Sequence, residues 1–357
     1  MARENNFDAL RLFAATLVLI GHDFPIMGNK NQPVVFGTQI SVYGLFIFFS
    51  ISGYLISKSW KNDPHIGRFL LKRSLRIFPA LAVLVLLTIF LLGPIVSQIP
   101  LAQYFSNIHT YDYLKNIGLY VTYGLPGVFY HVPVSYSVNV SIWSLPVEFF
   151  MYLVTPVVMV LFGRASPVAF AVLAAALGFA GFFLTWHYTG PQIVFYATDV
   201  RAASVTAAYF AAGAVFGSLS ERFRFQLSVG AIVACAYFLV MHFAGERFGT
   251  HAAVSSIFMF SYLALLAGTK SFKIFCRVGR RGDFSYGMYL YAFPIQQSIA
   301  LYFPKMAIGF AIILTAVLSL GCAAASWHFV EKIALSLKPR RSLPKAAPAG
   351  TAPTAAL

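Results

Sequence analysis

The chain has 357 residues, of which 59% are hydrophobic and only 10% are charged, and its mean hydropathy is +0.74. A soluble globular domain does not show such a composition, so we expect the chain to lie in a membrane. Its net charge of +15 is a poor indication of nucleic-acid binding, because the basic residues follow the pattern of membrane topology described next. Cys235, Cys276 and Cys322 have neither the spacing of metal ligands nor that of a disulfide framework.

Apolar segments recur along nearly the whole chain and predict an all-α, polytopic integral membrane protein with about ten transmembrane helices. Most of the 26 Lys and Arg residues lie between alternate spans or at the chain ends, which predicts that the N- and C-termini are both cytoplasmic. Residues 1–337 form the expected transmembrane domain, and the Pro- and Ala-rich residues 338–357 form an expected disordered cytoplasmic tail. The expected spans are 7–26, 36–57, 75–97, 142–163, 166–187, 202–218, 226–244, 252–268, 284–303 and 306–331.

The first span carries an arginine and a histidine, Arg11 and His22. Their spacing places both side chains on one face of a helix, about 16 Å apart along its axis. Charged and titratable groups are costly in hydrocarbon, so both residues are candidates for function. An ion-paired arginine or a packed histidine is an equally good interpretation of either residue alone, whereas the pair on one face favours function.

The second span and the cytoplasmic segment after it carry a small-residue pair and a basic cluster. Ser52 and Gly53 are interpreted as a site of close helix packing. Lys72, Arg73 and Arg76 lie at the entrance of span three, where Arg73 and Arg76 share one helical face. Arginine binds phosphate oxygens in a bidentate manner, so the cluster predicts a phosphate-bearing ligand at the cytoplasmic surface. An ordinary basic anchor of the membrane helix is the alternative.

The longest connection between spans, residues 98–141, is expected on the external side and is rich in tyrosine. Its aromatic rings could stack on sugar rings or cover an external opening, and an interfacial aromatic belt is the alternative. Tyr136 and His131 of this segment, with Trp143 at the start of span four, are therefore candidate contacts of an external substrate.

Span four contains a carboxylate, Glu148, near its external end. An unpaired carboxylate is unfavourable in a membrane, so we expect it to have a partner. His22 is also expected in the outer half of the bilayer, and the prediction is that Glu148 orients or polarises its imidazole. At the start of the ninth span, Asp283 and Ser285 are interpreted as helix N-caps, and Pro294 as a kink.

Taken in order, these residues resemble the signature of the acyltransferase-3 family of integral membrane acyltransferases. The resemblance covers about residues 6–335. Family members often have a histidine where this chain has Ala292 or Phe293, so no second catalytic histidine is expected there. The matching segments are Asp8 with Leu10, Arg11 and His22; Ser52 to Ile56; Arg73 with Arg76; Trp143, Ser144 and Leu145 with Glu148; and Ser285 to Pro294.

The resemblance implies a multi-pass O-acyltransferase of the bacterial inner membrane. Such an enzyme moves an acyl group, most commonly acetyl, from cytoplasmic acyl-CoA to a hydroxyl of an extracytoplasmic glycan or lipid-linked saccharide, such as O-antigen or exopolysaccharide. No metal is expected. The basic residues expected to hold the acyl-CoA are Arg11, Lys72, Arg73 and Arg76. The residues expected to contact the acceptor are Trp143, Tyr136 and His131.

His22 is the expected general base toward the acceptor hydroxyl, because imidazole ordinarily titrates near neutral pH. Glu148 or Asp23 would then pair with the imidazolium while the CoA thiolate departs. An acyl-histidine intermediate is the alternative mechanism.

A transporter or flippase is the competing class of function, because broken helices and intramembrane charges suit one. Transporters are commonly built from repeated halves, and the Arg–His pattern of the first span has no counterpart in the sixth. The sequence therefore predicts no internal repeat and favours acyl transfer.

Overall fold

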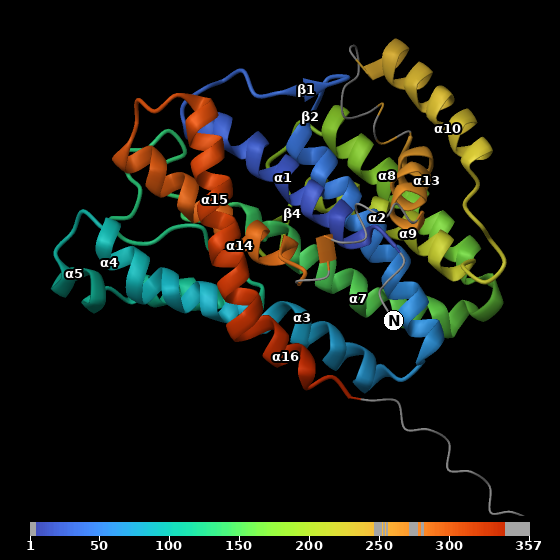
Figure 1. Cartoon of the computed structure of the whole chain (residues 1–357), viewed down its shortest axis with the longest axis horizontal. Helices are drawn as coiled ribbons and strands as arrows, with labels where there is room; N and C mark the ends of the chain where they lie inside the picture. The colour runs from blue at the N-terminus through green and yellow to red at the C-terminus, as the bar shows by residue number, and fades with distance from the viewer. Residues whose placement is uncertain are drawn as a thin grey trace, which may run out of the picture.

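The structure, a computed structural model, describes residues 5–245, 252, 254, 256–270, 278–279 and 282–339. Nearly all of its regular structure is helical, which confirms the expected all-α class, and the exceptions are two short β-hairpins (Figure 1). Beyond its first residues, the tail predicted at 338–357 lies outside the described part of the chain.

The elements follow one another along the chain as a series of long helices joined by short turns and one long irregular segment. The strands are β1 (Val34–Val35), β2 (Thr38–Gln39), β3 (Val194–Phe195) and β4 (Thr198–Asp199). The helices are α1 (Phe7–Ile26), α2 (Ile40–Asn62), α3 (Ile66–Leu87), η1 (Thr88–Leu92), α4 (Gly93–Val96), α5 (Leu101–Ser106), α6 (Ile108–Asp112), η2 (Tyr113–Gly118), η3 (Ser141–Trp143), α7 (Ser144–Phe162), η4 (Gly163–Ala165), α8 (Ser166–Trp186), α9 (Val200–Ser218), α10 (Leu227–Val240), η5 (Met241–Gly245), α13 (Ile257–Thr269), α14 (Ser285–Tyr302), α15 (Ile308–Ser326), η7 (Trp327–Glu331) and α16 (Lys332–Ser336).

Several of these helices can cross a membrane, which supports a multi-pass membrane protein. One stretch joins two expected spans, α7 and α8, through the short turn η4, and two apolar helices, Leu227–Phe243 and Ile257–Thr269, are shorter than the spans predicted there. The predicted number of ten spans is therefore not confirmed. The six stretches of described chain that are long and apolar enough are Phe7–Ile26, Ile40–Asn62, Ile66–Val96, Ser141–Trp186, Val200–Ser218 and Ile308–Ser336.

Helices α2 and α9 pack closely against each other through glycines. A Cβ added to Gly53 would overlap the backbone carbonyl of Phe210, and one added to Gly213 would overlap that of Ser50. Only glycine therefore permits this approach of the two backbones. The interpretation of Gly53 as a packing residue is confirmed.

The structure contains an internal repeat, so the prediction that there is none was wrong. Helix α1, the β1–β2 hairpin and α2 recur in the same order as α8, the β3–β4 hairpin and α9. In each unit a two-residue turn with positive φ angles joins the strands, formed by Phe36 and Gly37 in the first unit and by Tyr196 and Ala197 in the second. The repeat is hidden in the sequence because the equivalents of the polar residues in α1 are apolar: Phe182 stands in the place of His22.

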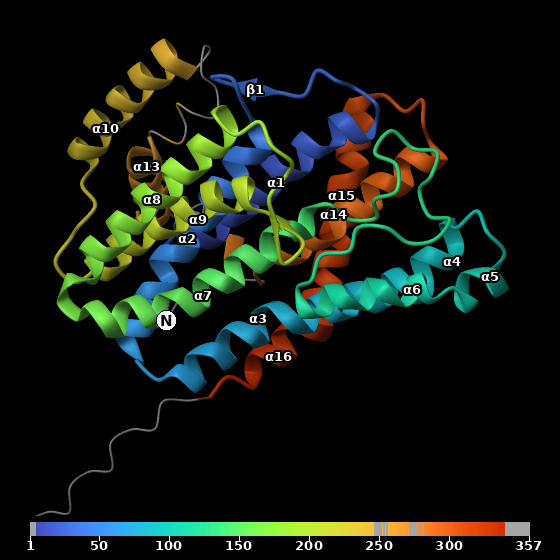
Figure 2. The same ribbon diagram turned by 180° about the vertical axis from the view of Figure 1, so that it is seen from behind.

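The two ends of the described chain lie on the same side of the bundle. Asn5 and Phe7 line a cavity that is also lined by Leu335 and Lys338. Helix α16 packs beside α3 at this end of the molecule, as both views show (Figures 1 and 2). This arrangement agrees with termini on one side of the membrane.

Candidate active site

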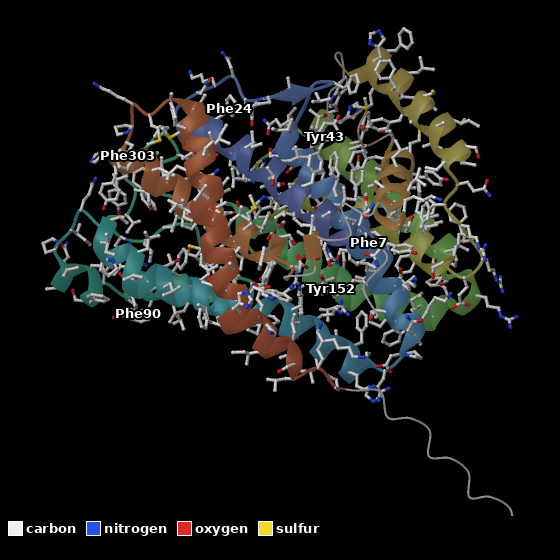
Figure 3. The ribbon with its side chains drawn as sticks, viewed as in Figure 1. Phe7, Phe24, Tyr43, Phe90, Tyr152 and Phe303 are labelled. Atoms are coloured by element: carbon white, nitrogen blue, oxygen red, sulfur yellow. The ribbon has the colours of Figure 1, made fainter. Side chains whose placement is uncertain are left out.

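A cavity of about 420 Å³ opens between α1, α2, α3, α7, α14 and the C-terminal helical segment. Phe7 and Tyr152, which line it, lie toward the interior of the bundle (Figure 3). The charged side chains in its wall are Asp8, Arg11, Arg73, Arg76, Glu148, Asp283 and Lys338. The fold thus brings three of the predicted donor-binding arginines together with Glu148, although they lie far apart in the sequence.

Arg76 is held by two carboxylates. Its Nη2 donates to Asp283 Oδ2 at 2.6 Å and its Nη1 donates to Glu331 Oε2 at 3.1 Å. Arg11 forms a longer ion pair with Asp283, at 3.4 Å, and another with Asp8, at 3.5 Å. The charge of Arg76 is therefore already balanced within the protein, and the residue ties the C-terminal segment to α3.

Asp283 is the centre of this ion-pair network. Its Oδ1 accepts the backbone N–H of Ser285 at 3.2 Å. The N-cap of α14 is Phe284 and Ser285 is its first residue, so the prediction that Asp283 and Ser285 are N-caps was wrong. Burial would raise the pKa of Asp283, but the guanidiniums of Arg76 and Arg11 outweigh it and lower that pKa to about 2. The ion-pairing roles of Asp283 and Glu331 were not predicted. For Glu331 the signal was present, since it is a carboxylate at the end of an apolar span, as Glu148 is near the start of one.

Arg73 differs from Arg76 in having no carboxylate partner within the described chain. One of its terminal nitrogens, Nη2, donates to Ser59 Oγ at 3.2 Å, and its buried Nε has no hydrogen-bond partner there. Its guanidinium also lies 5.8 Å from the centre of the Phe69 ring. Arg73 is therefore a cavity-lining cation with unused hydrogen-bonding capacity.

Lys72 does not line the cavity. Its Nζ donates to Asp63 Oδ2 at 2.7 Å, and Arg68 binds the same carboxylate at 2.6 Å. The hydrogen bonds from Arg68 and Lys72 hold the pKa of Asp63 well below its usual range. The position of Lys72 thus favours a surface ion pair over the predicted contact with the donor.

Glu148 is held by α2 and by its own helix. Ser52 Oγ donates to Glu148 Oε1 at 2.7 Å, and Tyr152 OH donates to the same oxygen at 2.7 Å. Ser52 therefore does more than permit helix packing, because it orients a carboxylate in the cavity wall. No pattern in the sequence predicted this contact.

His22 lies outside the cavity wall and is half-buried. Its Nδ1 is 3.3 Å from Ser141 Oγ, and its ring meets the Phe293 ring edge-on at 5.5 Å. Asp23 faces the other way, where Oδ1 accepts from Thr315 Oγ1 at 3.2 Å. In the part of the chain that the structure describes, neither Glu148 nor Asp23 hydrogen-bonds to His22, so the expected contact between Glu148 and His22 is not formed.

A short hydrogen-bonded path connects the cavity wall to His22. Ser144 and Tyr289 line the cavity, and their side-chain oxygens are 2.7 Å apart. Tyr289 OH also donates to the backbone carbonyl of Ser141 at 2.5 Å, and Ser141 is the residue that contacts His22. His22 therefore lies directly behind the wall formed by Ser144 and Tyr289.

The predicted acceptor contacts are not among the residues that line the cavity; they belong to η3 and to the irregular segment before it. Tyr136 is 62% exposed and packs against Tyr130, with ring centres 4.7 Å apart. His131 is exposed as well, and Trp143 is half-buried. Gln297 of α14 anchors this segment, because its Nε2 donates to the backbone carbonyl of Val134 at 2.6 Å.

The apolar surface and the charged internal cavity define a multi-pass membrane protein with a polar site inside its helix bundle. Residues 4–327 match the family described as acyltransferase domain, and the chain belongs to this family. It is therefore an acyltransferase enzyme, and the resemblance found in the sequence is confirmed.

Curated relatives match over most of the chain. The O-acetyl transferase of Shigella phage Sf6 is 30% identical over 97% of this chain and 99% of its own length. Nodulation protein 10 of Rhizobium leguminosarum bv. viciae is 30% identical over 94% of both chains. The peptidoglycan O-acetyltransferase OatA of Listeria monocytogenes is 26% identical over 81% of this chain, which corresponds to 50% of OatA. No solved structure matches the chain.

Proposed function

We propose that this protein transfers an acetyl group from acetyl-CoA, bound from the cytoplasm, to a hydroxyl of an extracytoplasmic glycan at the bacterial inner membrane. The acceptor class includes O-antigen, exopolysaccharide and lipid-linked saccharides. Two relatives are named as O-acetyltransferases, one of them acting on peptidoglycan, and this supports both the acetyl group and the glycan. The same family membership favours an enzyme over the competing transporter or flippase.

The observation that carries the donor site is the guanidinium of Arg73 in the cavity wall, which has no carboxylate partner in the described chain and a buried Nε without a hydrogen bond there. CoA presents phosphate groups, which arginine binds through charge-assisted hydrogen bonds. Arg11, with its longer ion pairs, is the second donor contact that we propose, whereas Arg76 organises the site through Asp283 and Glu331.

His22 is the proposed general base. The acceptor hydroxyl gives its proton to His22 as its oxygen bonds to the acyl carbon, and the carbon–sulfur bond then breaks. The proton passes from His22 to the departing CoA sulfur, so the reaction consumes and releases no net proton. Glu148 or Asp23 would pair with the imidazolium only after a side-chain movement, because neither carboxylate hydrogen-bonds to His22 in the described part of the chain.

The path from Ser144 to His22 sets a condition on this mechanism. The cavity is lined by Ser144 and Tyr289 and His22 lies beyond them, so we propose that these two side chains move to let the thioester reach His22. Trp143, Tyr136 and His131 remain the proposed contacts of the glycan on the external side.

The test is the O-acetyl content of the host's surface glycans, measured by NMR before and after mild base. A deletion strain is compared with the same strain carrying the wild-type chain, His22→Ala or Arg73→Ala at equal membrane abundance. We expect the ester signal to disappear on deletion, to return with the wild type and to stay absent with His22→Ala.

Arg68→Ala is the matched control for Arg73→Ala, since Arg68 lies on the same helix but pairs with Asp63 outside the cavity. Arg68→Ala should restore the signal and Arg73→Ala should restore it poorly. A full signal with His22→Ala would refute the catalytic role of His22. An unchanged signal in the deletion strain would refute the glycan acceptor.

A further inference from the structure

The structure holds His22 through Ser141. Ser141 begins η3, and its Oγ, 3.3 Å from Nδ1, is the hydrogen-bond partner of the imidazole among the described residues. The ring is otherwise in contact with Phe293. Among the described residues, Ser141 is therefore the polar group that can orient the His22 ring.

Ser141 is itself fixed on both sides of its backbone. Its N–H donates to Asn139 Oδ1 at 3.1 Å, and its carbonyl accepts from Tyr289 OH at 2.5 Å. Asn139 is fully buried and its Nδ2 donates to the backbone carbonyl of Leu290 at 2.9 Å. Ser141, which is 2% exposed, is thus anchored to α14 and can hold a side chain in a defined place.

In a neutral imidazole only one of the two ring nitrogens carries a proton. The hydrogen bond made by one nitrogen decides which of the two it is. If Nδ1–H donates to Ser141 Oγ, then Nε2 carries the free lone pair that a general base needs. If Ser141 Oγ–H donated to Nδ1, then Nε2 would carry the proton and could not accept another.

We propose that Ser141 is the positioning residue of the reaction and that it holds His22 with the proton on Nδ1 and the lone pair on Nε2. This inference rests on the proposed function, in which His22 accepts the proton of the acceptor hydroxyl. Nε2 takes that proton while the new ester bond forms, and returns it to the sulfur as the thioester bond breaks. Ser141 Oγ accepts from Nδ1–H throughout and exchanges no proton.

A serine in this place differs from a carboxylate in one respect. A carboxylate beside the ring would raise the pKa of an imidazole and favour its charged form, whereas a hydroxyl orients the ring without adding charge. Ser141 thus orients the His22 ring without placing a charge beside it.

The experiment measures transfer of radiolabelled acetyl from acetyl-CoA to membrane-bound polymer. Inverted membrane vesicles are made from the deletion strain carrying each full-length variant, and rates are followed across a range of pH. Ser141→Ala should lower kcat by at least about tenfold with little change in the KM for acetyl-CoA. Ser141→Thr, which keeps the hydroxyl, should recover part of the rate.

The decisive variant is Ser141→Asp, because a carboxylate next to the imidazole should move the acid limb of the kcat/KM profile to higher pH. Ser144→Ala is the matched control. It removes the hydroxyl bonded to Tyr289 but leaves the contact of Ser141 with His22, and its acid limb should stay at the wild-type pH. A structural role of Ser141 alone would lower the amount of folded protein without moving the acid limb.

The possible failures are distinguishable. If wild-type vesicles transfer no acetyl group, the proposed function fails. If they do, but His22→Ala keeps the wild-type rate, the catalytic role of His22 fails and the role of Ser141 fails with it. If His22 is required but Ser141→Ala keeps the wild-type kcat, or Ser141→Asp keeps the wild-type acid limb, only the role of Ser141 is overturned.

Discussion

The two arginines at the entrance of α3 should have separable roles, although they lie on one helical face. Replacing Arg76 by alanine leaves Asp283 and Glu331 without their shortest cationic contacts, and these side chains are only 12% and 2% exposed. Breaking a buried ion pair by removing one partner costs about 3–5 kcal/mol. Arg76 itself is 22% exposed, so we expect the lower end, about 3 kcal/mol, or roughly a hundredfold in the folded-to-unfolded ratio.

Replacing Arg73 by alanine breaks no ion pair in the described chain and removes the cavity cation that has unused donors. A hydrogen bond to a charged group contributes about 1.5–3 kcal/mol. Affinity for CoA should therefore fall by about tenfold to a hundredfold, with a smaller change in stability than for Arg76→Ala.

Both effects can be measured on the purified full chain in nanodiscs, with calorimetry for CoA binding and denaturant unfolding for stability. The double variant Arg76→Met/Glu331→Met should be less destabilised than the sum of its two single variants, because it removes a carboxylate together with its partner. The reasoning is refuted if Arg76→Ala keeps wild-type stability and loses only CoA affinity. It is equally refuted if Arg73→Ala binds CoA as tightly as the wild type.

Further predictions concern packing, the cavity carboxylate and pH. Gly53→Ala should lower the amount of folded protein in the membrane, because its Cβ would overlap the backbone of α9 and such overpacking costs about 1–3 kcal/mol. Gly321→Ala, which has open space at its Cβ, is the control in the same membrane-abundance assay. Equal losses of folded protein in the two variants would contradict the argument. Ser52→Ala should reduce acetyl transfer as Glu148→Gln does, since both loosen the hydrogen bond at 2.7 Å; wild-type transfer in both variants would exclude a role for this carboxylate. The native pKa of Asp283, about 2, lies below its ordinary value of 3.8, so its stabilisation should be complete above that ordinary value and be lost as pH falls toward 2. Unfolding of the wild type and Asp283→Asn from neutral pH to about pH 3 should show a constant difference that shrinks only near the acid end; a difference that already disappears in weak acid would contradict the ion-pair assignment.

The sequence predicted the residues of the cavity better than their contacts. Arg11, Arg73 and Glu148 do line one cavity, because the cost of charge in a membrane singles out such residues wherever they occur. Helical periodicity gives the face on which a residue lies but not the neighbouring helix that this face meets. His22 and Glu148 were thus placed at a similar depth, yet the hydrogen bonds of Glu148 go to Ser52 and Tyr152.

Contacts between distant segments were beyond the reach of local patterns. The partners of Arg76 come from the start of α14 and the end of η7, and nothing near Arg76 in the sequence indicates them. Lys72 and Arg73 are adjacent basic residues that the sequence does not distinguish, but in the structure Lys72 pairs with Asp63. The internal repeat is not visible in the sequence, because the two units share their backbone geometry and not the polar side chains of the first unit.

The cavity is closed by residues from both ends of the described chain, and this has a consequence for biogenesis. Asn5 and Arg11 are among the first described residues to be synthesised, whereas Glu331 and Lys338 are among the last. Until the C-terminal segment arrives, Arg76 lacks both of its carboxylates, since Asp283 also comes late in synthesis. A partly inserted chain therefore carries Arg76 without either of its carboxylates, which is unfavourable in a bilayer. Quality-control proteases that survey membrane proteins would therefore meet an unpaired Arg76 until Asp283 and Glu331 have been synthesised and have reached it.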